Sequence, residues 1–461
     1  MPARHAVRIR ARPGGPIRRP PLEEEHLPMH VAVIGAGVVG VCTAHWLRAA
    51  GHDVTVIDRR ANVAQETSFA PAAIAAPALA VPWSAPHMPG RWLRNWLRPH
   101  GPVVLRPGLS PANWLWLIRW LGESRARRFV ANQERLRRLA LLGREASLAL
   151  IAEREIDSRD RAGCLRLFRS ERALAAATAQ LPVLADAGFI VEEASPERCR
   201  EIEPALSDEL PLAGGLSLPD ARTGNVAWFT RQLKRALMAD GVRFHFRAEV
   251  NELDVSGGRP RLRLRATPEL QDPDLTWHPP SAPDTLEPDA VVLCTGTDSA
   301  GLLRRLGCSP GFVPVRGYSI TLGIRRHERA PLAAVIDEAT GVSITRMGNR
   351  MRVAGGVELG ARRELSADGP VPEALWRVMR GWFGGAADLT CPQIWVGERA
   401  LLPQGTPLLG ATPHPAVFVN LAHGSHGWTV AAGAGQVLAE LVSGRPAPID
   451  LDGLTLASLR R

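Results

Sequence analysis

Cysteine is scarce in this chain of 461 residues, which contains six. No two of them lie within four residues of one another, so the spacing excludes a zinc knuckle and a Cys-x-x-Cys redox pair. Six thiols are also too few for a disulfide scaffold in a chain of this length. We therefore expect a protein of the reducing cytoplasm, without a metal site.

Long apolar runs are absent as well. The least polar stretch, residues 70–83, is broken by Pro71, Pro77 and Pro82, and nothing in the sequence reaches the 18 or so apolar residues of a transmembrane helix. Hydrophobic residues make up 45% and charged residues 22% of the chain, which is the ordinary globular range and excludes disorder along the whole length. The length predicts two domains, or one domain with a large insertion.

Lysine is almost missing, because Lys234 is the only one, and arginine carries nearly all of the positive charge. Residues 1–28 contain six Arg against three Glu, and residues 91–147 contain twelve Arg against three Glu. These two segments account for the formal net charge of +10. Residues 1–28 have no apolar period, so we expect a disordered extension ahead of Met29. A transit peptide is the alternative, and the Glu run at 23–25 argues against it.

A glycine motif follows the first predicted strand. Residues 30–34 form a β-branched run, and Gly35, Gly37 and Gly40 come directly after it as G-x-G-x-x-G, ahead of a helical pattern. Gly35 allows a tight turn, Gly37 lets the backbone approach a pyrophosphate, and Gly40 lets the helix pack closely on the strand. The N-terminus of that helix presents free N–H groups to the phosphates.

A second predicted strand, residues 53–57, ends at Asp58. A carboxylate at this position accepts hydrogen bonds from both ribose hydroxyls and disfavours a 2′-phosphate. The motif therefore predicts FAD or NAD rather than NADP.

Two further segments favour FAD over NAD. Residues 416–421 read as a strand, 422–427 as a glycine-rich loop and 428–442 as a helix, so a second helix N-terminus would face the pyrimidine end of a flavin. Residues 289–296 read as a buried strand with a tight turn, which suits another approach of the chain to a dinucleotide.

With these motifs the chain resembles the D-amino-acid oxidase superfamily of FAD-dependent oxidoreductases, and within it the bacterial D-amino-acid dehydrogenase small-subunit family. The likeness extends from Met29 to about Asp450. Besides the glycine motif it is carried, in the family's order, by Glu66-Thr67-Ser68, Pro82-Trp83, Leu165-Arg166-Leu167-Phe168, Thr223-Gly224, Gly317-Tyr318-Ser319, Ile344-Thr345-Arg346, Asn349-Arg350, Gly405-Thr406-Pro407, His423-Gly424 and Gly427-Trp428-Thr429.

The resemblance implies an α/β fold in which a discontinuous Rossmann-type FAD-binding domain accompanies an α+β substrate domain with a mixed or antiparallel sheet. The FAD-binding domain is assigned to residues 29–95, 205–311 and 395–450. The substrate domain is assigned to residues 96–204 and 312–394, and residues 451–461 to a C-terminal tail. The residues expected to bind the cofactor are Gly35, Ala36, Gly37, Val38, Val39, Gly40, Asp58, Arg59, Thr67, Ser68, Thr295, Gly296, Gly424, Gly427, Trp428 and Thr429.

The resemblance also implies a reaction: oxidative deamination of a D-amino acid to a 2-oxo acid and ammonia, with hydride passing from the α-carbon to flavin N5. Some relatives that use oxygen place a lysine over the flavin, but Lys234 falls in a predicted helix, residues 230–239, of the dinucleotide domain. We therefore expect a quinone-type electron acceptor. The alternatives are an oxidoreductase of glycine, sarcosine or a D-proline derivative, a flavoprotein with little catalysis, and an NAD enzyme.

Four residues are candidates for the substrate site. Arg399 matches the family's carboxylate-binding arginine, whose planar guanidinium suits a bidentate contact. Tyr318, the single tyrosine, would donate to the same carboxylate or else lie half-buried in a sheet. Arg346 lies on a predicted strand of the substrate domain, and His423 either contacts the flavin or substrate or shapes its loop.

The chain departs from the family pattern near the expected flavin ring. The family usually has Asn-x-Gly-Gln where this chain has Pro71, Ala73 and Ile74, and a glycine where it has Ala422. We expect flavin binding to persist, because the dinucleotide motif is intact, and the substitutions to act on substrate choice or turnover.

Six of the thirteen tryptophans fall within residues 83–120, beside several arginines. Two interpretations stay open for this arm. It forms a core-facing stripe with a solvated basic back, or residues 83–147 lie in the headgroup layer on the inner face of the cytoplasmic membrane, where the arginines at 125–144 attract anionic lipid. No nucleic-acid motif accompanies the charge, so we expect no nucleic-acid partner.

Overall fold

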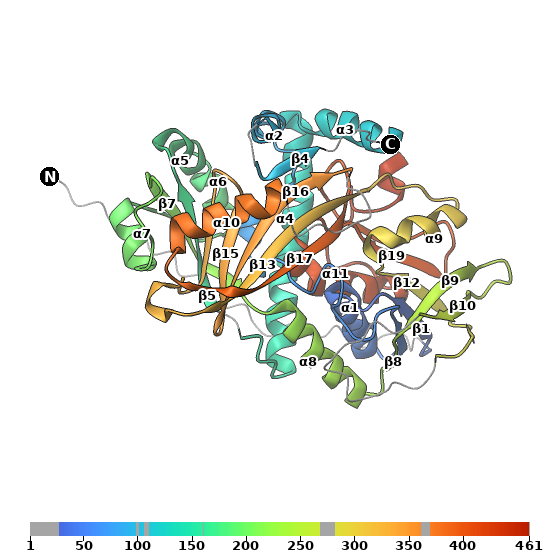
Figure 1. Cartoon of the computed structure of the whole chain (residues 1–461). Coiled ribbons are helices and arrows are strands. Elements are labelled where there is room, and N and C mark those ends of the chain that lie inside the picture. The colour runs from blue at the N-terminus through green and yellow to red at the C-terminus, as the bar shows by residue number, and fades with distance from the viewer. Residues whose placement is uncertain are drawn as a thin grey trace.

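The structure is a computed structural model that describes residues 27–97, 101–105, 110–159, 161–267, 282–360 and 369–460. The predicted extension, apart from residues 27 and 28, lies outside the described residues, and so does residue 461. Figure 1 shows two large sheets side by side, with the long helix α4 (Ala126–Glu153) running between them.

The first sheet has six strands in the order β18-β19-β12-β1-β2-β8. Its strands are β1 (His30–Ile34), β2 (Asp53–Ile57), β8 (Arg243–His245), β12 (Ala290–Leu293), β18 (Leu408–Ala411) and β19 (Val417–Leu421). All neighbours are parallel except β18 and β19. Valine and isoleucine fill β1 and β2 on both faces, as expected for parallel strands covered on both sides, and the glycine motif directly follows β1 as predicted.

Besides α4, three helices share the main core with this sheet. They are α1 (Val38–Ala49), α8 (Val226–Ala239) and α11 (Gly427–Val442), and their buried faces join Val31, Val33 and Val56 in one apolar cluster. A smaller three-stranded sheet, β11-β10-β9, lies beside it and consists of β9 (Ala248–Asp254), β10 (Arg261–Ala266) and β11 (Thr285–Leu286).

The second sheet has ten strands and mixed directions. Its main order is β17-β13-β16-β15-β14-β5-β7-β3, with β4 beside β16 and β6 beside β7. The strands are β3 (Ile74–Ala75), β4 (Val103–Leu105), β5 (Arg161–Phe168), β6 (Glu192–Ala194), β7 (Gly214–Thr223), β13 (Val313–Ile324), β14 (Ala334–Asp337), β15 (Val342–Met347), β16 (Arg350–Leu359) and β17 (Ala387–Leu401). Helix α10 (Pro370–Phe383) covers it with the fully buried Trp382 and Phe383.

The remaining helices are short apart from α3. They are α2 (Met88–Trp96), α3 (Pro111–Glu123), α5 (Glu171–Thr178), α6 (Leu181–Asp186), α7 (Pro196–Ile202) and α9 (Ser299–Arg305), with 3-10 turns at Pro77–Leu79, Gly296–Asp298, His327–Arg329 and Ala457–Arg460. No helix in the described part of the chain combines the length and hydropathy needed to cross a bilayer.

The α/β fold with two sheets agrees with the prediction, but α4 belongs elsewhere than predicted. It was expected in the substrate domain, yet its buried face packs on α11 and joins the core of the six-stranded sheet. The two helices touch through glycines: a Cβ atom on Gly143 would lie 2.3 Å from the carbonyl oxygen of Thr429, and one on Gly433 would lie 2.6 Å from the Gly143 nitrogen. The periodicity of apolar side chains could not predict this helix contact, because it is made by glycines, which have no side chain.

Two strands also cross the predicted boundaries. β7, expected in the FAD-binding domain with residues 205–311, pairs with β5 in the ten-stranded sheet. β17 begins before residue 395 and pairs with β13 along most of its length. The division of the chain into two domains as a whole stays a prediction. The expected tail is packed rather than loose, since Leu454 is fully buried and accepts a hydrogen bond from Leu409 through its carbonyl.

Each of the two interpretations of the tryptophan arm fits some of its residues. Trp92, Trp116 and Trp120 are buried and stack with ring centroids 4.5 to 6.4 Å apart, so they form a core, to which Trp83 adds an edge-on contact at 5.9 Å. Six large apolar side chains of α2 and α3 are nevertheless exposed, and they are Leu93, Trp96, Trp114, Leu115, Ile118 and Leu121.

Candidate active site

A cavity of about 1950 Å³ lies between the two sheets. Its wall includes the β1–α1 turn, the loop before α11, and parts of β13, β16 and β17. Segments from both ends of the chain therefore meet around one space, as the sequence predicts.

The β1–α1 turn has the geometry that its glycines predict. Gly35 has φ +105°, and a Cβ atom there would lie 2.6 Å from the carbonyl oxygen of Cys294. A Cβ atom on Gly40 would lie 1.8 Å from the carbonyl oxygen of Gly35. Gly37 occupies the N-cap of α1 and lines the cavity. The backbone can therefore approach a ligand phosphate closely at the positive end of α1.

Asp58 follows β2 at the edge of this turn. Its carboxylate oxygens accept hydrogen bonds from the N–H groups of Ala36 (2.7 Å) and Arg60 (2.8 Å). Burial raises the pKa of Asp58, while these two N–H groups act in the opposite direction. A carboxylate offers about four acceptor positions, so Asp58, which lines the cavity, retains capacity for ribose hydroxyls.

The N-terminus of α11 faces the cavity at a second place. His426 is its N-cap residue, but the side chain does not cap the helix, since Nε2 contacts the carbonyl oxygen of Val81 at 3.0 Å. Gly427, Trp428 and Thr429 line the cavity. Helix N-termini attract anions and electron-rich carbonyls, so this end is suited to a group that gains negative charge.

His423 lies beside this helix and is 8% exposed. Burial lowers its pKa to about 4, so the ring is neutral at pH 7. Its Nε2 atom is buried and has no hydrogen-bond partner among the described residues. A buried polar atom without a partner is costly, which indicates that a bound ligand satisfies it.

These observations fit a bound FAD: a glycine cradle for the diphosphate, a carboxylate for the ribose, and a second helix N-terminus with an unsatisfied histidine nitrogen. Every residue predicted to bind the cofactor lines the cavity except Ala36 and Gly40. Those two do not line the cavity but support residues that do. Ala36 donates its N–H group to Asp58, and Gly40 packs against Gly35.

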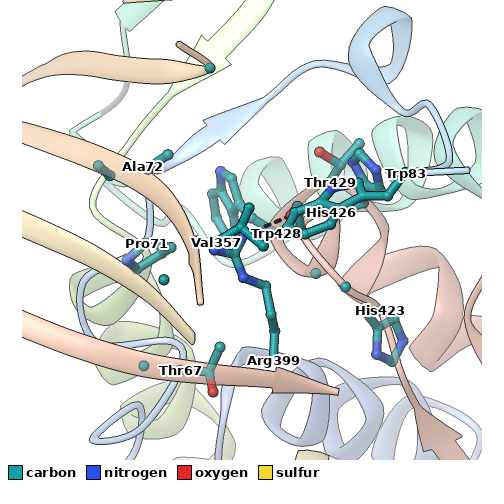
Figure 2. A pocket seen from close by; sticks show the side chains of 18 of the residues that line it. Thr67, Pro71, Ala72, Trp83, Val357, Arg399, His423, His426, Trp428 and Thr429 are labelled. Atoms are coloured by element: carbon teal, nitrogen blue, oxygen red, sulfur yellow. Dashed lines mark hydrogen bonds between the residues drawn. The ribbon is translucent and has the colours of Figure 1, made fainter. Parts of the chain in front are cut away.

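Arg399 projects from β17 into the cavity, between Pro71 on one side and Trp83 and His426 on the other (Figure 2). Its Nη1 donates to Ser425 Oγ at 2.7 Å, and its Nη2 donates to the carbonyl oxygen of Gly356 at 3.1 Å. Among the described residues no carboxylate is paired with it, and burial lowers its pKa to about 10, so it remains a cation at pH 7. An unneutralised guanidinium in such a place is a receptor for a ligand carboxylate.

Trp83 and Ser425 complete the arginine's surroundings, and the sequence did not single them out for this role. The Arg399 guanidinium carbon lies 5.1 Å from the centroid of the Trp83 ring, in a cation–π arrangement that stabilises a charge removed from water. Only the family's Pro-Trp motif at residues 82–83 could have indicated Trp83.

Tyr318 lines the cavity but has a different partner from the predicted one. Its hydroxyl donates to Glu358, a carboxylate buried on the adjacent strand β16. A buried carboxylate needs donors, so the phenol proton is directed to Glu358 and not to a substrate carboxylate.

Arg346 was predicted in the substrate site, and the structure places it outside the cavity wall. Its guanidinium contacts Nδ1 of His327 at 2.9 Å and the carbonyl oxygen of Pro331 at 3.3 Å. The neighbouring Thr345 points the other way and donates to Ala72 at the cavity. Because side chains alternate along a strand, Arg346 cannot face the same side.

The unusual segment at residues 71–73 forms a firmly held wall of the cavity. Each of its three carbonyl oxygens accepts a hydrogen bond: Pro71 from Arg352 (3.3 Å), Ala72 from Thr345 (2.9 Å), and Ala73 from the Gly224 N–H (3.1 Å). The sequence analysis identified this segment as unusual but gave no sign that Arg352 holds it. The buried guanidinium of Arg352 also donates to Thr321.

Lys234, by contrast, lies on α8 away from the cavity wall and donates to Asn62 at 2.8 Å. In the described parts of the chain, no group of three or more His, Cys, Asp or Glu side chains is arranged to hold a metal ion.

Comparison with known proteins identifies the family to which this chain belongs. A family model described as "DAO: FAD dependent oxidoreductase" matches residues 30–441. The chain belongs to the DAO family of FAD-dependent oxidoreductases. FAD is therefore its cofactor, and the NAD alternative is discarded.

Curated DAO-family relatives match almost the whole chain. A D-amino acid dehydrogenase of Agrobacterium fabrum is 36% identical and covers 93% of this chain and 99% of its own length. A D-amino acid dehydrogenase of Vibrio cholerae is 36% identical over 93% of this chain and 98% of its own.

Solved structures show the same fold at lower identity. Glycine oxidase from Geobacillus kaustophilus superposes with a TM-score of 0.70 at 19% identity, covering 93% of this chain and 98% of its own. L-proline dehydrogenase from P. horikoshii superposes with a TM-score of 0.68 at 15% identity, and the match covers 94% of this chain and 99% of that structure's chain.

Proposed function

We propose that this enzyme oxidises D-amino acids to 2-oxo acids and ammonia and passes the electrons to a quinone-type acceptor. The observation that carries the proposal is Arg399, an unpaired guanidinium that faces a cavity fitted for FAD. The names of the relatives, D-amino acid dehydrogenases at 36% identity over 93% of the chain, support the D-configuration of the substrate.

The protein's part in such a reaction is mainly to bind and orient. Arg399 holds the substrate carboxylate, and Trp83 closes one side with an apolar ring. Holding one end of the substrate limits the orientations of the α-C–H bond. Such orientation lowers the entropic part of the activation barrier. When bound, FAD supplies the acceptor for the α-hydrogen and two electrons. His423 is neutral, and its unpartnered Nε2 atom is available to hydrogen-bond the cofactor or the substrate.

The quinone-type acceptor is favoured over oxygen by the position of the single lysine. Lys234 is held by Asn62 on a helix away from the cavity wall, so no lysine side chain is supplied to the site. Peroxide formation under air, measured against reduction of a soluble quinone, tests this part. Rapid peroxide release at a rate equal to quinone reduction would contradict it.

A substrate panel tests the reaction itself. The FAD-loaded enzyme is assayed for dye reduction with both enantiomers of alanine, and with glycine, sarcosine and D-proline. We expect D-alanine to be oxidised and L-alanine to be inert. Preference for glycine or sarcosine would favour the related amine oxidoreductase, whose fold the glycine oxidase structure shares. Oxidation of none of them would favour a weakly catalytic flavoprotein.

We also propose that the outward face of α2 and α3 lies against anionic lipid. The two helices share the buried tryptophan stack, and they project the exposed side chains of Leu93, Trp96, Trp114, Leu115, Ile118 and Leu121. Arg119 on α3 and Arg125 and Arg127 at the start of α4 are exposed and carry no ion pair among the described residues, so positive charge follows this apolar face along the chain. Apolar side chains beside free arginines suit a headgroup layer.

Vesicle flotation tests the membrane proposal. We expect the enzyme to float with vesicles containing anionic lipid at low salt, and Trp96→Ser with Trp114→Ser to abolish flotation without loss of folding. Val183→Ser, an exposed apolar residue on α6, is the matched control and should float. An enzyme that stays in solution with anionic vesicles at low salt would contradict the proposal.

A further inference from the structure

The wall of the same cavity also contains a region rich in arginine. Five arginines line this part of the cavity, and we name it the arginine lobe: Arg91, Arg94, Arg166, Arg169 and Arg172. They come from α2, β5, the turn after β5, and the start of α5. The acidic residues of the dinucleotide end, such as Asp58 and Asp298, line the other part of the cavity.

Two arginines of the lobe share one carboxylate. Glu338 accepts from Arg91 Nη1 at 2.9 Å through Oε1 and from Arg166 Nη2 at 2.8 Å through Oε2. Arg91 Nη2 also donates to the Glu338 carbonyl oxygen at 2.5 Å. The two guanidiniums lower the pKa of Glu338 against the effect of burial, so the carboxylate is ionised. The three groups together retain one positive charge in a place that is only about one quarter exposed.

Two of the other three arginines add to this excess. Arg169 is paired with Asp337 behind the wall, while Arg94 and Arg172 are exposed and carry no ion pair among the described residues. Five guanidiniums therefore face two carboxylates, an excess of three positive charges. His87 also lines this region, but burial and Arg91 lower its pKa, so it is neutral at pH 7.

A series of backbone contacts links Arg399 to the arginine lobe. Arg399 donates to the carbonyl oxygen of Gly356, next to Gly355 on β16. A Cβ atom on Gly355 would lie 3.4 Å from the Gly341 carbonyl oxygen, and one on Gly341 would lie 3.4 Å from Arg91 Nη2. The two cationic sites thus line one cavity.

We infer that the arginine lobe receives the side chain of the substrate and selects an amino acid whose side chain ends in a carboxylate. The inference rests on the proposed function, in which Arg399 holds the α-carboxylate. A cleft lined by one sign of charge attracts the opposite charge and raises its local concentration, and guanidinium–carboxylate pairs are stronger away from bulk water. A D-amino acid with a neutral side chain gains neither effect.

Paired isosteric substrates test the inference in the FAD-loaded enzyme. We expect kcat/KM for D-glutamate to exceed that for D-glutamine about tenfold or more at low salt, and the ratio to fall as ionic strength rises. Arg94→Gln with Arg172→Gln should lower the D-glutamate to D-glutamine ratio several-fold. Arg235→Gln, which removes one positive charge from an exposed position on α8 outside the cavity wall, should leave the ratio unchanged.

A binding measurement separates this inference from the reaction. The fluorescence of Trp83 and Trp92, which line the cavity, should report glutarate binding, and glutarate should bind at least tenfold more tightly than its monoamide. Tighter glutarate binding with no oxidation of any D-amino acid would keep the lobe's carboxylate preference and reject the proposed function. Equal binding of the two ligands, or a D-glutamate to D-glutamine ratio near one at every salt concentration, would overturn the inference.

Discussion

A Cβ atom on Gly317 would lie 2.0 Å from Nη2 of Arg399 and 2.9 Å from the central carbon of its guanidinium. The two residues lie on the paired strands β13 and β17. Glycine at 317 therefore provides the space in which the arginine reaches Ser425 and the cavity.

Gly317→Ala should displace the Arg399 guanidinium while the fold persists, because the atoms in conflict are the far end of a flexible side chain. We expect KM for D-alanine to rise and kcat/KM to fall by roughly 10- to 100-fold, as for a misplaced binding group. Gly323→Ala is the matched control on the same strand, since its Cβ would be 3.8 Å from the nearest atom. Equal kinetics for both variants would contradict the proposed role of Arg399.

Arg399→Lys keeps a cation but loses the planar fork that contacts a carboxylate with two parallel hydrogen bonds. The loss of one charged hydrogen bond and of the contacts to Ser425 and Gly356 should cost about 2–3 kcal/mol, or on the order of a 100-fold fall in kcat/KM. Steady-state kinetics with D-alanine provide the measurement. Kinetics like those of the unmodified enzyme would mean that the substrate carboxylate binds elsewhere.

The lowered pKa of His423 predicts that the folded protein loses stability in mild acid. Burial lowers its pKa in the folded protein to about 4, below the ordinary value of 6.5. The unfolded chain therefore binds the proton first, and stability falls as the pH drops from about 6.5 towards 4, by at most about 3 kcal/mol from this residue. His423→Gln should weaken the fall of Tm between pH 7 and 4.5.

The exposed His327 provides a control for this pH experiment. His327→Gln should leave the pH dependence of Tm as it is in the unmodified protein. If His423→Gln leaves the same steep dependence, His423 is not the buried neutral group that the structure describes.

Ala422 and Ala73 occupy backbone conformations that favour glycine, with φ of +59° and +62°. A left-handed conformation costs an alanine roughly 1–2 kcal/mol, and glycine's greater freedom in the unfolded chain returns part of that difference. Ala422→Gly should therefore stabilise the protein by about 0.5–1 kcal/mol. Ala431→Gly, inside α11, should destabilise it by about 1 kcal/mol. Thermal unfolding compares them, and destabilisation by both substitutions would contradict the argument.

The dinucleotide half of the site could be predicted from the sequence because its determinants are local. Strands β1 and β2, the turn at Gly35 and the loop before α11 each follow from a short motif whose residues are neighbours in the chain. The predicted strand that carries Arg346 was confirmed for the same reason, as β15.

The features that the sequence did not predict depend on residues distant in sequence. Arg346 and Thr345 alternate along one strand, and only the neighbouring segments decide which of them faces the cavity. Tyr318 finds Glu358 across two strands, and α4 meets α11 through glycines that show no apolar period. The arginine lobe likewise assembles from two segments that are far apart in the chain, residues 91–94 and 166–172, so no single motif contains it.

Anaerobic reduction of the FAD-loaded enzyme tests the central claim most directly. Addition of D-alanine in the absence of oxygen and dye should bleach the flavin absorbance band within a single turnover, while L-alanine leaves the band unchanged. A purified protein that carries and accepts no FAD, or a flavin that neither D-alanine nor any other D-amino acid bleaches, would contradict the account.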